Sequence, residues 1–140
     1  MQYRYPLALV ALLATGAAHA ADPACSIDVE GQPGKKFAPA HIVVPATCKD
    51  FTVRLIHTGK NSKEKAGHNW VLTKTEDIDA VMVDGIKAGA AHDFLAPGDA
   101  RILAKTPMLG GGETATVTFP VSRLAAGQSY TCLLYTARCV

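Results

Sequence analysis

The sequence has no long run of one charge, no internal repeat and no low-complexity stretch. Its formal net charge is +2 over 140 residues, whereas a domain that grips nucleic acid is strongly basic. No nucleophile–base pair, carboxylate dyad or phosphate loop stands out. The glycines at 110–112 are not followed by Lys-Ser or Lys-Thr, as a phosphate loop requires. These absences argue against nucleic-acid binding and against an enzyme.

The chain also has no apolar run long enough to cross a membrane near its start. Residues 6–14 are apolar, but a spanning helix takes about 18 residues or more. Arg4 precedes this run, and the small-x-small tripeptide Ala-His-Ala ends at residue 20. This pattern predicts a secretory signal peptide over 1–20 and a single exported domain over 21–140, with no membrane anchor.

None of the cysteines forms a C-x-x-C pair, which argues against a thioredoxin-like dithiol and a structural zinc knuckle. Export to an oxidising compartment would permit disulfides instead. The four cysteines are Cys25, Cys48, Cys132 and Cys139.

Short segments with alternating apolar and polar residues dominate the rest of the chain. In the clearest one, Phe51, Val53 and Leu55 share one face. Such alternation between Gly- and Pro-containing turns predicts an all-β fold of antiparallel strands packed as a sandwich or barrel. The expected strands lie at 25–31, 41–44, 51–57, 69–74, 100–105 and 114–121.

One segment, 75–91, has helical spacing instead, and we expect a short helix outside the sandwich. Thr75 is the expected N-cap, and Ile78 and Val81 mark the apolar face. Asp84-Gly85 is expected to interrupt or end the helix.

The spacing of Leu124, Gly127 and Tyr130 predicts a tyrosine corner. In Greek-key sandwiches the phenol hydroxyl of such a tyrosine bonds to an upstream backbone group. A strand should therefore follow Tyr130.

His68 is the strongest candidate for a metal ligand. A lone histidine at a strand end is usually a hydrogen-bonded structural residue, but here Gly67 allows a close backbone approach and Asn69 carries a short amide. A blue-copper site needs two imidazoles and one thiolate in a trigonal plane. His68 fits the imidazole that comes alone, early in the chain.

The stretch from Cys25 to Tyr130 resembles the azurins, small periplasmic cupredoxins that carry single electrons. The resemblance implies a Greek-key β-sandwich with a helical flap, one copper ion, and redox partners such as c-type cytochromes or copper enzymes. The similar stretches are CSIDVEG, CKDFTVRLIHTG, GHNWVL, VDGIKAG, DFLAPGDARILAKT, LGGGE and VTFPVSRLAAGQSY.

The resemblance also implies roles for residues around the site. Gly67 would offer copper an axial carbonyl and His68 an equatorial nitrogen. Asn69 would brace the ligand loop, and His57 would be a pH-sensitive histidine beside the site rather than a ligand.

Two further features are implied by the same resemblance. Ala66 and Ile86 match positions of an apolar patch that contacts redox partners. Cys25 and Cys48 would form the structural disulfide; the residues themselves leave a Cys132–Cys139 pair possible.

The sequence departs from the azurins after Tyr130. There the family continues with Phe-Cys-Thr-Phe-Pro-Gly-His and then a methionine, whereas this chain reads TCLLYTARCV, with no histidine after His92. Cys132 is two residues, or about 6.5 Å of strand, short of the thiolate position. We therefore expect impaired copper binding and a missing last strand that exposes its neighbour's edge. Met108 is expected to be partly exposed in a turn, and His41 and His92 to lie on the surface.

A frameshift would explain this departure. A one-nucleotide shift in allowed codons from Leu133 onward can restore Phe-Cys-Thr-x-Pro-Gly, though not the histidine that follows. Two other functions stay open: a metal-free, disulfide-clipped binding module, and a protein that holds Cu(I) through Cys132, Cys139 and His68 without redox cycling.

Overall fold

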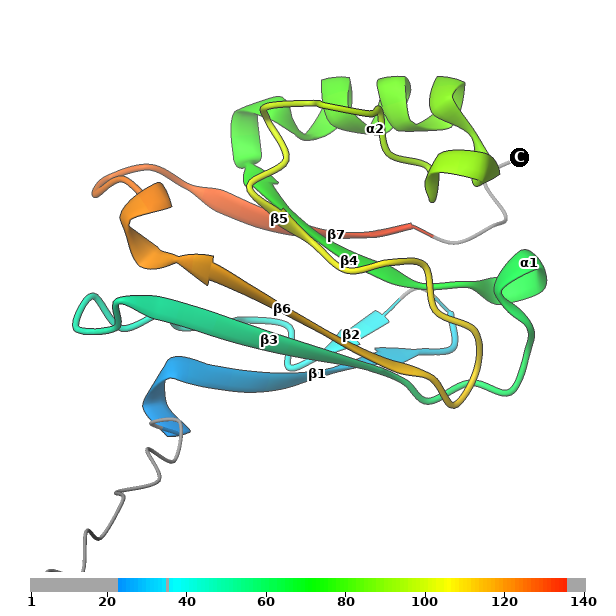
Figure 1. Cartoon of the computed structure of the whole chain (residues 1–140), viewed down its shortest axis with the longest axis horizontal. Helices are drawn as coiled ribbons and strands as arrows, with labels where there is room; N and C mark the ends of the chain where they lie inside the picture. The colour runs from blue at the N-terminus through cyan, green and yellow to red at the C-terminus, as the bar shows by residue number, and fades with distance from the viewer. Residues whose placement is uncertain (1–22, 35, 136–140) are drawn as a thin grey trace, which may run out of the picture.

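The computed structural model describes residues 23–34 and 36–135, which form two β-sheets packed face to face (Figure 1). The first sheet has the strand order β2-β1-β3-β6 and the second has the order β5-β4-β7. The strands are β1 (Ser26–Gln32), β2 (Lys36–Ala38), β3 (Asp50–His57), β4 (Asn69–Lys74), β5 (Ala104–Lys105), β6 (Thr114–Pro120) and β7 (Tyr130–Tyr135). The helices are α1 (Lys63–Ala66) and α2 (Ile78–Ala88), with short 3-10 turns at Pro23–Cys25, Thr75–Asp77, Ala90–His92 and Val121–Arg123.

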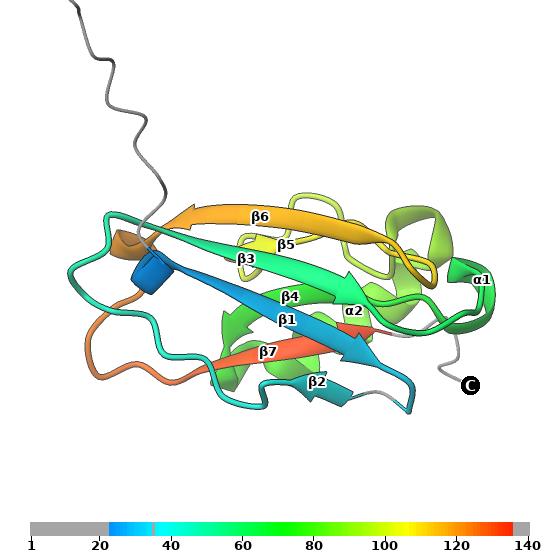
Figure 2. The ribbon, with the colours of Figure 1, turned by 90° about the horizontal axis from the view of Figure 1, so that it is seen from below.

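The first sheet confirms the alternation of its strands. In β3, Phe51, Val53 and Leu55 are buried while Arg54 is exposed. β3 pairs with β6 antiparallel but with β1 in parallel, so the expectation of antiparallel strands was wrong for this pair. Figure 2 shows β1 running between β2 and β3. The inward side chains of this sheet form one half of the core.

The second sheet is covered on both faces. Five of the six residues of β4 are buried. On the inner face the Trp70 ring stacks on Phe119 of the first sheet, with ring centroids 6.4 Å apart. On the outer face Val71 packs in a cluster with Val81 of α2, and Figure 1 shows α2 lying over this side of the sheet. The predicted all-β Greek-key β-sandwich with a helix outside it is confirmed.

The details of the helix were predicted wrongly. Thr75 is not its N-cap: it lies in a 3-10 turn, and its hydroxyl bonds to the hydroxyl of Thr131 at 2.9 Å. The helix also continues through Gly85, which is buried in it, and ends before Gly89 at a φ of 72°. Gly89 adopts this left-handed conformation readily because it has no Cβ.

Two predicted strands are also corrected. Residues 41–44 form no strand, although Ile42 and Val44 are half-buried and Val43 is 82% exposed. Their alternation is that of a strand, but no neighbouring strand pairs with them within the described part of the chain. Of residues 100–105 only Ala104–Lys105 are in a strand, because the preceding residues turn back onto Asp99.

The disulfide and the tyrosine corner are confirmed. Cys25 is bonded to Cys48, which ties the start of β1 to the segment before β3. The backbone N–H of Ala125 donates to the Tyr130 hydroxyl at 2.7 Å.

Several expectations lie outside the described residues: the signal peptide over 1–20, Cys139, and the missing last strand, which would follow residue 135. Among the residues that are described, no helix has the length and apolar character needed to cross a membrane.

Candidate metal centre

His68 is fixed in the molecule at the entrance to β4. Its backbone N–H donates to the Leu109 carbonyl at 3.0 Å, and its carbonyl accepts from the Leu109 N–H at 2.8 Å. Its ring is 2% exposed and packs beside Gly31 of β1, where an added Cβ would lie 3.4 Å from it. Both sheets therefore position this imidazole.

A second buried imidazole contacts His68 edge-on. Nε2 of His57 lies 2.5 Å from Nδ1 of His68, and both nitrogens also approach the Ala66 carbonyl, at 2.7 and 3.1 Å. The backbone N–H of Gly59 donates to Nδ1 of His57 at 3.0 Å. That nitrogen must carry a lone pair, so the proton of the neutral His57 ring is on Nε2. Nδ1 of His68 then accepts this proton's hydrogen bond.

The environment of His68 favours its neutral form. Burial lowers the pKa of His68, the charge of His57 lowers it further, and the carbonyls of Ala66 and Gln32 oppose this in part. Nε2 of His68 is buried and has no partner in hydrogen-bond geometry. A neutral imidazole is the form that binds metals, so His68 suits the predicted ligand role.

Gly67 cannot carry a side chain in this structure. An added Cβ would lie 2.5 Å from the Lys63 carbonyl oxygen and 2.9 Å from the Met108 sulfur. Met108 itself is 9% exposed, so the expectation of a partly exposed turn residue was wrong. The bridge between His68 and Leu109 draws this turn inward, and Met108 fills the space left by Gly67.

Asn69 is buried, and its side-chain N–H₂ donates to the carbonyl of Asp93 at 2.9 Å. It therefore holds the loop after α2 against β4. The predicted ligand loop would follow residue 135, so its bracing by Asn69 stays a prediction.

The remaining expected residues lie around this end of the molecule or on the surface. Ile86 is 50% exposed on α2, and Ala66 is half-buried at the end of α1. His41 and His92 are exposed, as predicted. No sequence pattern predicts that the Gly59 N–H and the Ala66 carbonyl contact the two rings, because both contacts use backbone atoms.

Cys132 does not reach the histidines. It lies opposite Leu72 in the β4–β7 pair, whereas the His68 end of β4 begins at Asn69, opposite Tyr135. Three residues of strand, about 10 Å, separate the two places. Burial between the sheets raises the pKa of the Cys132 thiol to about 11, so the sulfur is held as a thiol rather than a thiolate.

The part of the chain that the structure describes does not complete a blue-copper site. It has no group of three or more His, Cys, Asp or Glu side chains placed to hold a metal. The buried imidazole of His68 fits one ligand position of such a site. The thiolate and the second imidazole of the trigonal set are not among these residues.

Comparison with known proteins identifies the family. Residues 23–135 match the family described as copper binding proteins, plastocyanin/azurin family. The chain is 47% identical over 129 residues to azurin of Bordetella pertussis, covering 92% of this chain and 86% of that protein. It is 48% identical over 106 residues to azurin-1 of Alcaligenes xylosoxydans xylosoxydans, covering 76% and 82%.

A solved structure agrees with these relatives. The azurin Az-iso2 of the obligate methylotroph Methylomonas sp. strain J is similar with a TM-score of 0.75 and 39% identity, covering 82% of this chain and 88% of that one. The relatives indicate one copper ion as the cofactor. The chain belongs to the plastocyanin/azurin family of copper-binding proteins.

Proposed function

We propose that this protein is an azurin-type carrier of single electrons in the periplasm, not an enzyme, with copper held on one side by His68 and the Gly67 carbonyl. The observation that carries the proposal is the buried ring of His68, whose surroundings favour its neutral form. Its Nδ1 atom accepts one hydrogen bond, from the N–H of His57, and a metal could replace this bond. Family membership supports copper as the metal. When bound, copper supplies the one-electron couple.

Hydrogen bonds hold the buried residues around His68 in fixed positions. The bridge to Leu109 fixes the backbone of His68, and the bond from Asn69 to Asp93 fixes the adjacent loop. The Nδ1 atom of His68 accepts a hydrogen bond from His57, and a metal on this nitrogen would replace that bond. Rigid positioning of this kind keeps rearrangement between redox states small.

Electron exchange is proposed to occur through the apolar surface near this end, which includes Ala66 and Ile86. Scattered exposed apolar residues are common on protein surfaces, so these two alone do not define a partner. The proposed partners are redox proteins, such as c-type cytochromes or copper enzymes.

In a polypeptide with the printed sequence, we propose that this function is impaired. The stretch after Tyr130 offers Cys132 and Cys139 as thiols but no histidine, and Cys132 is held between the sheets. Cu(II) added to such a chain should not give the intense thiolate-to-copper absorption of a blue site.

The test compares the printed chain with a variant whose residues after Cys132 are replaced by the family's Phe-Cys-Thr-Phe-Pro-Gly-His loop and closing strand, which places the new cysteine at position 134. The repaired protein should bind one copper ion and turn blue, and His68→Gln should abolish the colour while His92→Gln keeps it. A repaired chain that stays colourless, or stays blue without His68, refutes the proposal. Tight Cu(I) binding by the printed chain would instead favour a copper-holding protein.

A further inference from the structure

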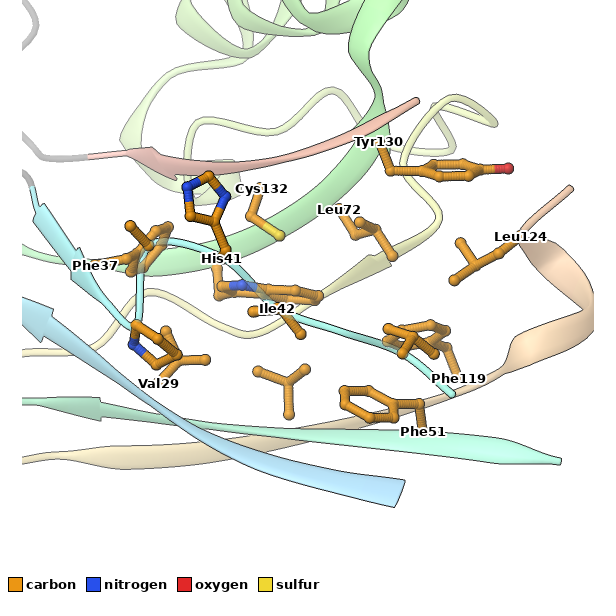
Figure 3. A pocket seen from close by; sticks show the side chains of 15 residues that line it. Val29, Phe37, His41, Ile42, Phe51, Leu72, Phe119, Leu124, Tyr130 and Cys132 are labelled. Atoms are coloured by element: carbon orange, nitrogen blue, oxygen red, sulfur yellow. The ribbon is translucent and has the colours of Figure 1, made fainter. Parts of the chain in front are cut away.

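The large apolar side chains of this protein mostly face the space between the two sheets, as Leu72 and Phe119 do in Figure 3. Helix α2 differs. Met82 is 38% exposed, Val83 is 51% exposed and Ile86 is 50% exposed, and all three lie within two turns of this one helix. Single exposed apolar residues are common on protein surfaces, whereas a contiguous group of them indicates an interaction site.

The outward face of α2 follows from the position of its buried residues. Val81 and Gly85 are the buried residues of this helix. Because successive helical residues are about 100° apart, Val83 points nearly opposite to both of them. Asp79 and Lys87 lie one turn before and one turn after Val83 on the same side, and both are exposed. Figure 1 shows α2 as the outermost element on its side of the molecule, so another protein can reach this face.

The order of residues along this outward face is self-complementary. Asp79 and Lys87 are each four residues from Val83. Ala80 and Ile86 are each three residues from it. In a two-fold symmetric pair of antiparallel α2 helices centred on Val83, Asp79 of one copy therefore faces Lys87 of the other copy at both ends. The exposed side chain of Ile86 faces the small Ala80 of the other copy, and the two helix dipoles oppose each other favourably.

Both charged side chains are available to a second copy. Asp79 makes no ion pair with the described part of the chain. The Lys87 side chain is 71% exposed and its Nζ lies 3.1 Å from Asp84, an exposed pair that contributes little to stability. Asp84 also accepts a hydrogen bond from Arg101 at 2.8 Å. Lys87 can therefore turn to a new partner without leaving Asp84 unpaired.

We propose that a second copy of this chain binds this face and forms a weak, two-fold symmetric dimer through antiparallel α2 helices. The 11 residues of α2 give a contact about 16 Å long, which is shorter than the interface of a stable dimer requires. The dimer therefore forms only at high protein concentration. It needs no copper and does not rest on the proposed electron transfer. It covers Ile86, so it competes with redox partners for that part of the surface.

The test uses the metal-free protein with Cys132→Ala and Cys139→Ser, which prevent disulfide exchange between molecules. Sedimentation equilibrium at protein concentrations of about 0.01 to 1 mM should show a reversible equilibrium between monomer and dimer. Val83→Asp places two carboxylates together at the two-fold axis and should weaken dimerisation at least about tenfold. Val43→Asp is the matched control, because Val43 is also exposed and apolar but lies away from α2. It should leave dimerisation unchanged.

Two charge reversals test the antiparallel register. Asp79→Lys alone brings lysines together at both ends of the helix pair, and Lys87→Asp alone brings carboxylates together there. Each protein should therefore dimerise at least about tenfold more weakly than the parent. A mixture of the two proteins should associate as tightly as the parent, because each lysine of one copy then faces a carboxylate of the other.

A parent protein that stays monomeric throughout this concentration range would overturn the proposal. Equal dimerisation of the Val83→Asp and Val43→Asp proteins, or a mixture of folded charge-reversal proteins that does not associate, would also overturn it. If a charge-reversal protein does not fold, as judged by circular dichroism, the comparison of Val83→Asp with Val43→Asp decides alone.

Discussion

Nδ1 of His68 lies 2.5 Å from Nε2 of His57, and the two rings meet edge-on at 88°. Because the Gly59 N–H fixes the proton of His57 on Nε2, His68 is the acceptor in this contact. The two neutral imidazoles are therefore joined by one hydrogen bond, and protonating both rings would place two positive charges in a buried space. This contact links the candidate metal ligand to His57, for which the family resemblance implies a pH-sensitive role.

The first prediction concerns this pair in the metal-free protein. Burial, with the neighbouring charge of His57, lowers the pKa of His68. His57→Gln removes that charge, so the pKa of His68 should rise, as measured by NMR titration of its ring protons. His92→Gln, at an exposed position, is the control and should leave the titration unchanged. An identical His68 titration in His57→Gln would contradict the assigned contact.

The lowered pKa of His68 also predicts how the free energy of unfolding changes with pH. A histidine whose pKa is lowered by folding binds its proton more readily in the unfolded chain, so protonation favours unfolding. The contribution of His68 to the free energy of unfolding is thus complete above the unfolded pKa of about 6.5. It decreases as the pH falls below that value.

A second prediction tests the close packing at Gly67. Gly67→Ala places a Cβ 2.5 Å from the backbone oxygen of Lys63, and backbone cannot rotate away as a side chain can. We expect the free energy of unfolding to drop by about 1–3 kcal/mol, measured by urea denaturation. Gly31→Ala is the matched control, since its Cβ meets only ordinary contacts at 3.4 Å from His68. It should be neutral or stabilising by about 0.5 kcal/mol.

If both glycine variants were equally stable, the contact of Gly67 with α1 would be looser than described. A loss confined to Gly67→Ala would support the packing of Met108 and Lys63 around the His68 turn.

Much of the fold could be predicted because its signals are local. The alternation in β3 and β6 follows from one face of each strand packing on the core, and the tyrosine corner follows from three residues with fixed spacing. Residues 41–44 show the limit of this reasoning. Alternation predicts which side chains face inward. A strand also needs a neighbouring backbone to pair with, and the sequence of the segment alone does not show whether one is present.

The errors at the helix and the site have the same origin. Gly85 was expected to interrupt or end α2, but it is buried within the helix, which continues to Ala88. Met108 was expected in a partly exposed turn, but its neighbour Leu109 forms a β-bridge with His68, which is distant in the sequence, and Met108 is thereby buried. Long-range backbone contacts of this kind leave no periodic trace in the sequence.

A third prediction measures the tyrosine corner. Tyr130→Phe keeps the ring in the core but removes the acceptor of the Ala125 N–H. The free energy of unfolding should decrease by about 1 kcal/mol, as determined by urea denaturation. Ser129→Ala, at the exposed neighbouring position, should have no measurable effect. A Tyr130→Phe protein as stable as the parent would mean that water replaces the hydroxyl without cost.

The last prediction concerns Arg101, which joins α2 to the loop before β5. Its guanidinium donates to both carboxylate oxygens of Asp99, at 2.8 and 2.7 Å, and to Asp84 of α2 at 2.8 Å. The Arg101 guanidinium is the main cause of the lowered pKa of both Asp99 and Asp84. The Asp99 side chain is only 6% exposed, so it depends on this partner more than the open Asp84 does.

Arg101→Met should therefore destabilise the protein in a pH-dependent way. A carboxylate whose pKa is lowered by folding contributes stability that is present above its unfolded pKa, about 3.9, and is lost as the pH falls through the folded value. The difference in free energy of unfolding between parent and variant should be constant above about pH 5 and shrink below about pH 4. Lys87→Met removes an exposed partner of Asp84 and should change stability much less. A parent–variant difference that persists unchanged at pH 3 would show that Arg101 acts through packing of its side chain rather than through its charge.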